Sequence, residues 1–224
     1  MNTGRVLSSL ANILVILFFP ALASCQGDPS PLVLCCAGDS IMRPIPAHLR
    51  QLLPARRPDF VIHEWAQGGL STTTYQSFYR ENAEEWRKVR PDFILLQIGT
   101  NDVVPVLESR STLENFKSDL SQILMEFRTY RTAAGEPSCL LVATVPLFSN
   151  DPANLLKNDL VKAEINPALR SVAALAGAHI VDNIAVLEGK EDLYDPDGVH
   201  PNLRGEAALA DNWVRAILSR TGGK

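Results

Sequence analysis

Three short polar segments of this chain carry side chains that could perform acyl-transfer chemistry. Ser40 follows a Gly-Asp pair and could act as a nucleophile that also presents its own amide to a bound carbonyl. Asn101 stands in a Gly-Thr-Asn-Asp segment, and its side-chain amide could donate a hydrogen bond to an oxyanion. His200 is a natural general base near neutral pH, and Asp197, three residues earlier, could orient its ring. Together these residues could supply a nucleophile, a base, an orienting acid and oxyanion donors.

Each segment taken alone also has an ordinary structural explanation. The Gly-Asp-Ser and Asn-Asp sequences are good turns, and Asp197 or Asn202 could simply cap a helix. A metal pair formed by Asp197 and His200 would lack further ligands nearby, so we predict no metal site. Ser40 also lacks the Gly-x-Ser-x-Gly elbow, which excludes the α/β-hydrolase arrangement.

The hydrophobic pattern predicts five strands that alternate with helices. Residues 31–37 form a continuous apolar run, as is typical of a strand buried on both faces. Further strands are expected at 59–65, 92–98, 139–145 and 178–182, and helices at 46–53, 75–89, 111–129, 158–176 and 201–219, the last with Pro201 in its first turn. We expect mobile loops at 101–110 and 150–157.

This alternation indicates an α/β fold, with a parallel sheet covered by helices on both faces. The three polar segments follow predicted strands or lie in the last loop, and ligands of such sheets bind at the carboxyl ends of the strands. Because no linker or repeat divides residues 31–220, we predict one domain there, followed by a tail at 221–224.

The order and content of these segments resemble the conserved blocks of the SGNH, or GDSL, hydrolases. The resemblance covers nearly the whole chain after residue 30. It implies a flavodoxin-like three-layer fold with strand order 2-1-3-4-5, and serine-dependent hydrolysis of esters or thioesters without a metal or an organic cofactor. It also implies that Ser40 is the nucleophile, His200 the base and Asp197 its partner.

The same resemblance implies an oxyanion hole. Its donors would be the Ser40 amide, the Asn101 side chain and the amide of a glycine in the second block. We assign that glycine to Gly69, which lies two residues before a serine, with Gly68 as the alternative. Many members of the family have an asparagine early in this block, and this chain lacks it.

The sequence of the first 25 residues predicts that the protein is exported from the cytoplasm. A charged start, an apolar run and a small-residue exit are typical of a signal peptide, which we place at 1–24, followed by a linker at 25–30. The sequence ending at Cys25 resembles the lipobox of bacterial lipoproteins, which implies lipidation of Cys25 in the periplasm or cell envelope. Ordinary cleavage after Ala23 would instead give a soluble secreted protein.

The composition of the chain limits the classes of partner and substrate that we expect. The net charge of −4 and the lack of a basic block argue against nucleic acid, and a membrane would be reached only through the lipid anchor. Because no lid domain is inserted, we expect short acyl esters, acetyl above all, on a small molecule or a carbohydrate. The alternatives are a lysophospholipase or thioesterase for longer chains, and a non-catalytic envelope binding module.

Overall fold

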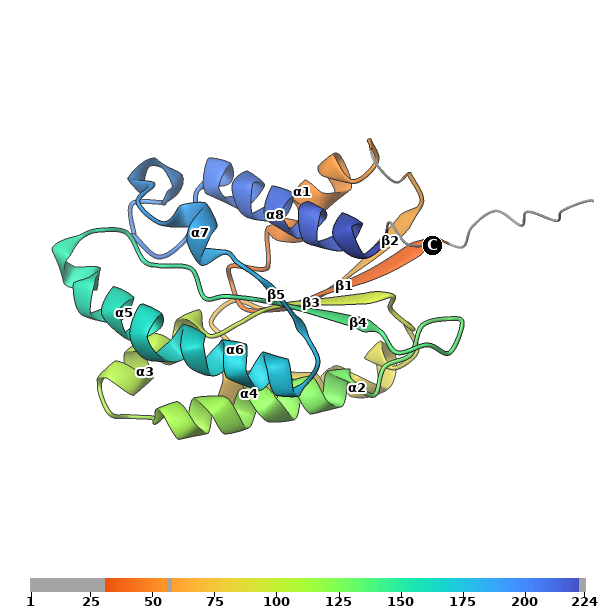
Figure 1. Cartoon of the computed structure of the whole chain (residues 1–224), viewed down its shortest axis with the longest axis horizontal. Coiled ribbons are helices and arrows are strands. Elements are labelled where there is room, and N and C mark those ends of the chain that lie inside the picture. The colour runs from red at the N-terminus through yellow and green to blue at the C-terminus, as the bar shows by residue number, and fades with distance from the viewer. Residues whose placement is uncertain (1–30, 56–57, 222–224) are drawn as a thin grey trace, which may run out of the picture. The chain divides into compact units, whose positions relative to one another are not determined.

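A five-stranded parallel sheet forms the centre of the computed structural model, which describes residues 31–55 and 58–221 (Figure 1). The strands lie in the order β2-β1-β3-β4-β5, and all four neighbouring pairs are parallel. This confirms the expected fold class and strand order. The bounds are β1 Leu32–Gly38, β2 Phe60–Ala66, β3 Phe93–Gln97, β4 Cys139–Ala143 and β5 His179–Val181.

The central strands are apolar on both faces because helices cover both faces. Along β1, Cys35 and Ala37 belong to one hydrophobic cluster, whereas Leu34 and Cys36 belong to the other. This alternation is the two-residue period of a strand applied to two cores. It explains why the sequence of β1 is a continuous apolar run rather than an alternating one.

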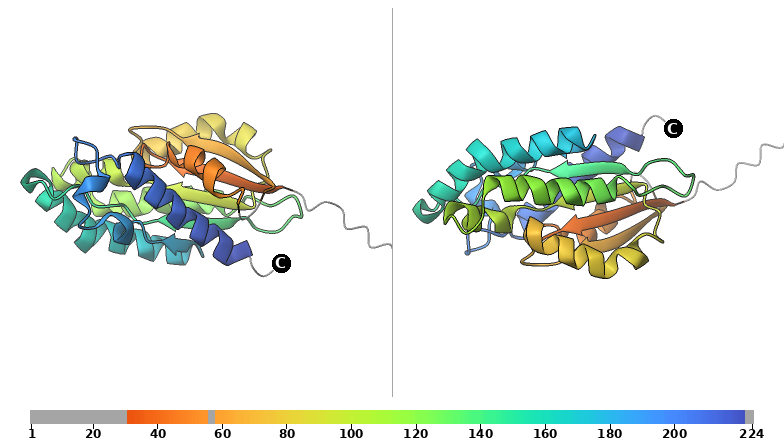
Figure 2. Two further views of the ribbon diagram at one scale, coloured as in Figure 1. Left: turned by 90° about the horizontal axis from the view of Figure 1, so that it is seen from above. Right: turned by 90° about the horizontal axis from the view of Figure 1, so that it is seen from below.

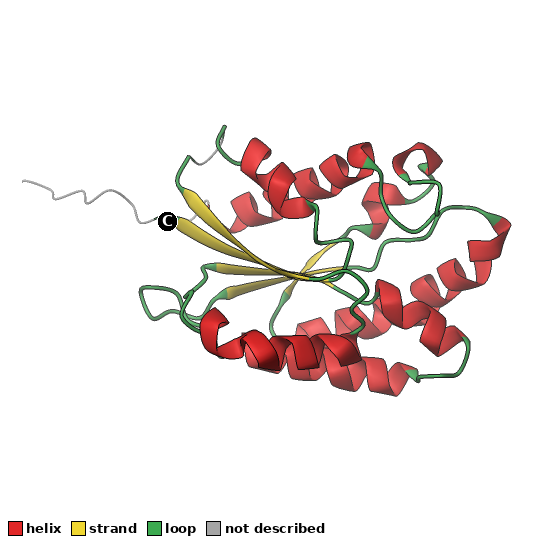
Figure 3. Cartoon of the chain, turned by 180° about the vertical axis from the view of Figure 1, so that it is seen from behind, coloured by secondary structure: helices red, strands yellow, loops and turns green. Residues whose placement is uncertain are grey.

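The helices form two layers, one on each side of the sheet (Figures 1 and 3). The first layer contains α1, α7 and α8, and the second contains α2, α4 and α6 (Figure 2). The short helices α3 and α5 contact each other. The bounds are α1 Ile45–Leu52, α2 Thr72–Trp86, α3 Val103–Leu107, α4 Leu113–Phe127, α5 Leu155–Leu160, α6 Asn166–Leu175, α7 Ile184–Leu187 and α8 Leu203–Thr221.

Both segments expected to be loops contain helices, so that expectation was wrong. Residues 101–110 contain part of the 3-10 turn Thr100–Asp102 and all of α3, whose apolar Val103 is fully buried. Residues 150–157 contain the 3-10 turn Pro152–Asn154 and the start of α5. Short helices of five or six residues give too little hydrophobic periodicity to be recognised in a sequence.

Two helix predictions also need correction. The helix expected over 158–176 consists of α5 and α6 with a π-turn, Val161–Ile165, between them. The last helix begins at Leu203, and Pro201 precedes it in an isolated bridge to Tyr194. Pro201 therefore shapes the preceding loop instead of starting the helix.

The predicted signal peptide, Cys25 and the linker lie outside the described residues, as do residues 222–224. Thr221, the first residue of the predicted tail, is the last residue of α8. Within 31–55 and 58–221, no helix has the length and apolarity needed to span a membrane.

Candidate active site

Ser40 stands just beyond the carboxyl end of β1, where the backbone passes very close to β3. Gly38 has φ of 140°, and a Cβ on it would lie 1.8 Å from the Gln97 carbonyl oxygen. The Asp39 amide then donates to that same oxygen at 3.0 Å. Glycine is therefore required at position 38, because only its lack of a side chain permits this approach.

The structure brings the three sequence-predicted residues Ser40, His200 and Asp197 into one hydrogen-bonded chain. His200 Nε2 lies 2.9 Å from Ser40 Oγ, and His200 Nδ1 lies 2.6 Å from Asp197 Oδ2. Ser40 and His200 are 160 residues apart in sequence, so the fold creates this contact. The geometry is that of a nucleophile, a base and a group that orients the base.

The Asp197 carboxylate is held in its charged form by its surroundings. Partial burial raises its pKa, but hydrogen bonds from the His200 ring and from the amides of His200 and Val199 outweigh that effect. The net result lowers the pKa of Asp197 to about 2. A carboxylate that stays ionised at neutral pH can stabilise the imidazolium that forms when His200 accepts a proton.

A tight loop before α8 presents His200. Gly198 has φ of 65°, and its amide donates to the Asp195 carbonyl, while the Asp195 amide donates to the His200 carbonyl. Asn202 then accepts hydrogen bonds from the first amides of α8 and donates to the carbonyls of Asp192 and Tyr194. The expected capping role of Asn202 is therefore present, and it anchors the loop as well.

Asn101 follows β3 and reaches across to the second block. Its Nδ2 donates to the Leu70 carbonyl at 3.0 Å. A primary amide carries two N–H groups, so this bond fixes the side chain while one N–H remains for a second acceptor. The structure thus places the Asn101 amide between β3 and the loop that contains both candidate glycines.

The two candidate glycines differ in their environment. Gly69 has φ of 80°, and a Cβ on it would meet nothing within 4 Å. A Cβ on Gly68 would lie 3.8 Å from Ser40 Cβ and 3.7 Å from an Arg43 guanidinium nitrogen. The loop therefore passes beside Ser40 at Gly68, and the left-handed backbone that favours glycine occurs at Gly69.

The residue before Ser40 is a buried carboxylic acid, Asp39. Asp39 is fully buried, and its Oδ1 accepts from the Ile41 amide at 3.0 Å. Burial is the main reason that the pKa of Asp39 is raised to about 7. Asp39 thus braces the turn that carries Ser40, and its charge is sensitive to pH near neutrality.

Trp65, Tyr75 and His48 make structural contacts within the fold. Trp65 and Tyr75 are buried in an aromatic cluster, where the Tyr75 hydroxyl donates to the Trp65 carbonyl. His48 pairs with Glu206 at 3.0 Å, which links α1 to α8. These contacts join neighbouring elements of the fold.

The site is open to solvent on the side of the histidine. The side chains of His200 and Asp197 are 42% and 50% exposed. Within the described parts of the chain, no three His, Cys, Asp or Glu residues gather as a possible metal cluster. The groups that the structure does gather are those of nucleophilic acyl transfer.

Residues that support the histidine loop were missed at the sequence level. The Ser149 amide donates to the Gly198 carbonyl at 2.8 Å, and the Tyr194 hydroxyl donates to the Leu147 carbonyl at 2.7 Å. Both bonds tie the segment after β4 to the loop of Asp197 and His200. No local pattern in the sequence marks contacts between positions so far apart.

Comparison with known proteins agrees with this arrangement. Residues 36–208 match the model of the GDSL-like Lipase/Acylhydrolase family. The acetylxylan esterase of Xylanibacter ruminicola is 29% identical over an alignment of 140 positions, which covers 57% of this chain and 29% of that protein. A multidomain esterase of Ruminococcus flavefaciens is 30% identical over 138 residues, which are 58% of this chain and 16% of that protein. This chain therefore spans less than a third of the length of these curated relatives.

A solved structure supports the fold. Axe2, an acetylxylan esterase from Geobacillus stearothermophilus, superposes with a TM-score of 0.64 at 19% identity, covering 83% of this chain and 94% of Axe2. At this low identity the likeness concerns the fold. The three-layer arrangement and the order of its strands are thus those of a known group of solved structures.

Proposed function

Because this chain belongs to the GDSL-like lipase/acylhydrolase family, we propose that it is a carboxylic-ester hydrolase that works through an acyl-enzyme on Ser40. The observation that carries the proposal is the hydrogen-bonded chain from Ser40 Oγ through His200 to Asp197. A serine hydroxyl is a weak nucleophile unless an adjacent base takes its proton. His200, which lies 2.9 Å from Ser40 Oγ, is in the position of that base.

The proposed reaction proceeds in two halves. Ser40 Oγ attacks the ester carbonyl while its proton passes to His200 Nε2, and His200 then protonates the departing alcohol. In the second half, His200 takes a proton from water as the water attacks the acyl-enzyme, and it then gives this proton to Ser40 Oγ as the acid is released. Asp197 keeps the imidazole in the tautomer that accepts at Nε2 and stabilises its protonated form.

The oxyanion of each tetrahedral intermediate would be held by three donors. These are the amide of Ser40, the free N–H of the Asn101 side chain and the amide of Gly69. The bond from Asn101 to the Leu70 carbonyl supports this assignment, because a donor that is already oriented needs little reorganisation in the transition state.

The proposed substrate is an acetyl ester on a carbohydrate. Two similarities support this choice, since the Xylanibacter relative and the Geobacillus structure are both called acetylxylan esterases. The exposure of His200 and Asp197 also suits an ester that projects from a large polar alcohol. The longer-chain alternatives, lysophospholipids and acyl thioesters, require room for an extended apolar chain.

A chain-length series tests both parts of the proposal. Residues 26–224 would be assayed with p-nitrophenyl esters from C2 to C12 and with acetylated xylo-oligosaccharides, beside the Ser40→Ala variant. We expect the highest kcat/KM for acetyl esters and no turnover in the variant. Normal turnover by Ser40→Ala would refute the mechanism, and preference for C8–C12 over C2 would refute the acetyl assignment. A protein inert to every ester and to serine-directed phosphonates would favour a binding module.

We also propose export, with lipidation of Cys25, from the sequence at residues 1–25. Expression of the full chain with a labelled fatty acid should yield a membrane-associated, labelled protein. The Cys25→Ser variant should lose the label and appear in the soluble fraction. Label retained by that variant, or wild-type protein without label, would contradict the lipid anchor.

A further inference from the structure

The chain immediately after β4 is buried but has no regular secondary structure. Residues 144–149 pass between α6 and the histidine loop, and all six are buried. Buried backbone amides and carbonyls need hydrogen-bond partners, and here no neighbouring strand supplies them all. For Val145 and Phe148 the partners come from the side chains of two asparagines on the helices that follow.

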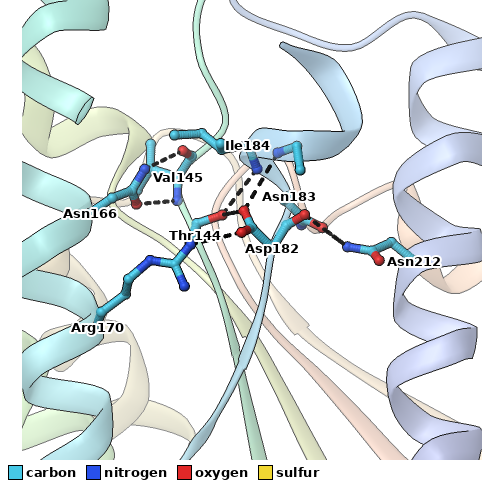
Figure 4. A network of polar contacts seen from close by, with 9 residues as sticks. Thr144, Val145, Asn166, Arg170, Asp182, Asn183, Ile184 and Asn212 are labelled. Carbon is cyan, nitrogen blue, oxygen red and sulfur yellow. Dashed lines mark hydrogen bonds and ion pairs between the residues drawn. The ribbon is translucent and has the colours of Figure 1, made fainter.

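Each asparagine binds both backbone groups of one residue. Asn166 accepts from the Val145 amide at 2.8 Å and donates to the Val145 carbonyl at 2.9 Å (Figure 4). Asn158 does the same for Phe148, at 2.8 and 3.1 Å, and also donates to the Ser149 carbonyl at 3.3 Å. The side-chain amides thus replace the partner strand that this segment lacks.

The π-turn explains how both asparagines reach the same segment. Eight residues of regular α-helix make about 2.2 turns, which would leave Asn158 and Asn166 roughly 80° apart around the axis. A π-turn takes up one extra residue, so the two side chains return to nearly the same face. The Asn166 amide donates to the Val161 carbonyl, five residues back. Pro167 favours this turn, because it has no N–H to donate to Ala163 and its ring would crowd that carbonyl.

The clamped segment in turn carries the histidine loop. Its Ser149 amide donates to Gly198, which lies between Asp197 and His200, and its Leu147 carbonyl accepts from Tyr194. The contact at Gly198 is tight, since a Cβ there would lie 2.4 Å from Ser149 Oγ. A displacement of the segment by a fraction of an ångström would therefore be passed to the loop.

We propose that Asn158 and Asn166 are positioning residues that hold His200 at hydrogen-bonding distance from Ser40 by fixing the segment Val145–Ser149. Neither asparagine touches the reacting atoms. Their effect passes through Ser149 and Leu147 to the loop, and then to the imidazole. The inference rests on the proposed ester hydrolysis only for its kinetic readout, because the position of His200 can also be observed without a substrate.

The test compares Asn158→Ala with a matched control, Ser138→Ala. The Ser138 side chain is also buried and donates to a backbone carbonyl, that of Pro91 at 2.6 Å. It lies at the amino end of β4, far along the strand from the site. Both variants should lower the urea midpoint of unfolding.

Only Asn158→Ala should affect the site. We expect a loss of at least about tenfold in kcat for p-nitrophenyl acetate with little change in KM, because a misplaced base slows chemistry more than binding. The pH profile of kcat/KM and the NMR resonances of the His200 ring should change as well. Ser138→Ala should keep the wild-type values of all of these.

Equal kcat losses in the two variants, with an unchanged His200 resonance, would overturn the inference. If Asn158→Ala does not fold, Tyr194→Phe removes a single bond of the same support and should move the His200 resonance; an unmoved resonance would refute the proposal. If the wild type hydrolyses no ester, the proposed function fails, but the NMR comparison still decides whether these asparagines position His200.

Discussion

Replacing Asn101 with alanine tests the oxyanion hole quantitatively. The side chain makes one described bond, from Nδ2 to the Leu70 carbonyl at 3.0 Å, and it is only partly buried. Losing that bond should destabilise the fold by about 1 kcal/mol. Losing the second N–H should cost about 2.7–4 kcal/mol in the transition state, which lowers kcat by roughly 10²–10³. KM should change little, because the oxyanion exists only after attack.

Ser71→Ala provides the matched control for this experiment. Ser71 is the N-cap of α2 and accepts from the Thr74 amide, so its loss should destabilise the same loop by about 1 kcal/mol. It removes no oxyanion donor. Steady-state kinetics with p-nitrophenyl acetate and urea unfolding would be measured on both variants. If kcat of Asn101→Ala stays within about threefold of that of Ser71→Ala, the reasoning about Asn101 is wrong.

Three further predictions concern the same site. The pKa of Asp39 is about 7 in the folded protein, whereas its ordinary value is 3.8. Between about pH 4 and pH 7, Asp39 is therefore protonated in the folded state but ionised in the unfolded state. Its contribution to the free energy of unfolding consequently falls as the pH rises through this range. Asp39→Asn should remove this pH dependence of the free energy of unfolding, which urea unfolding at several pH values would measure. If the free energies of variant and wild type change in parallel with pH, the prediction is wrong. Asp197→Asn should lower kcat by about 10⁴, because the imidazole loses its orienting partner; kinetics at several pH values would show whether the loss persists, and a loss below tenfold would exclude the assigned role. Gly69→Ala should cost about 1–2 kcal/mol of stability because of its left-handed backbone, and it should also reduce kcat. Gly68→Ala should leave both stability and kcat unchanged. A larger loss of kcat in Gly68→Ala than in Gly69→Ala would assign the oxyanion role to Gly68.

The strands and the polar segments at their ends were predictable because their signals are local. The apolar run of β1 is directly followed by Gly-Asp-Ser, and the apolar run of β3 is closely followed by Gly-Thr-Asn-Asp. Each signal can therefore be identified within a few consecutive residues. The order of the strands came from the resemblance to a family, since composition alone cannot fix which strands are neighbours. The structure confirms both the parallel sheet and its order.

The supporting network was not predictable because its signals are distant or ambiguous. Asn158 and Asn166 appear in the sequence as polar positions of one amphipathic helix, and a regular helix would not place them together. The π-turn depends on Pro167 and on the packing around it. Contacts such as Ser149 with Gly198 join residues that are 49 positions apart, and only the closed fold reveals them.

The wide separation of Ser40 and His200 along the chain has a consequence for biosynthesis. Ser40 lies two residues after the end of β1, whereas His200 lies three residues before the start of α8. A nascent chain therefore contains Ser40 long before His200 has been made, and in the proposed mechanism the serine hydroxyl has no base beside it until the C-terminal part of the chain has folded. Recovery of ester hydrolysis during refolding should accordingly be a late event, which follows the appearance of helical structure in circular dichroism.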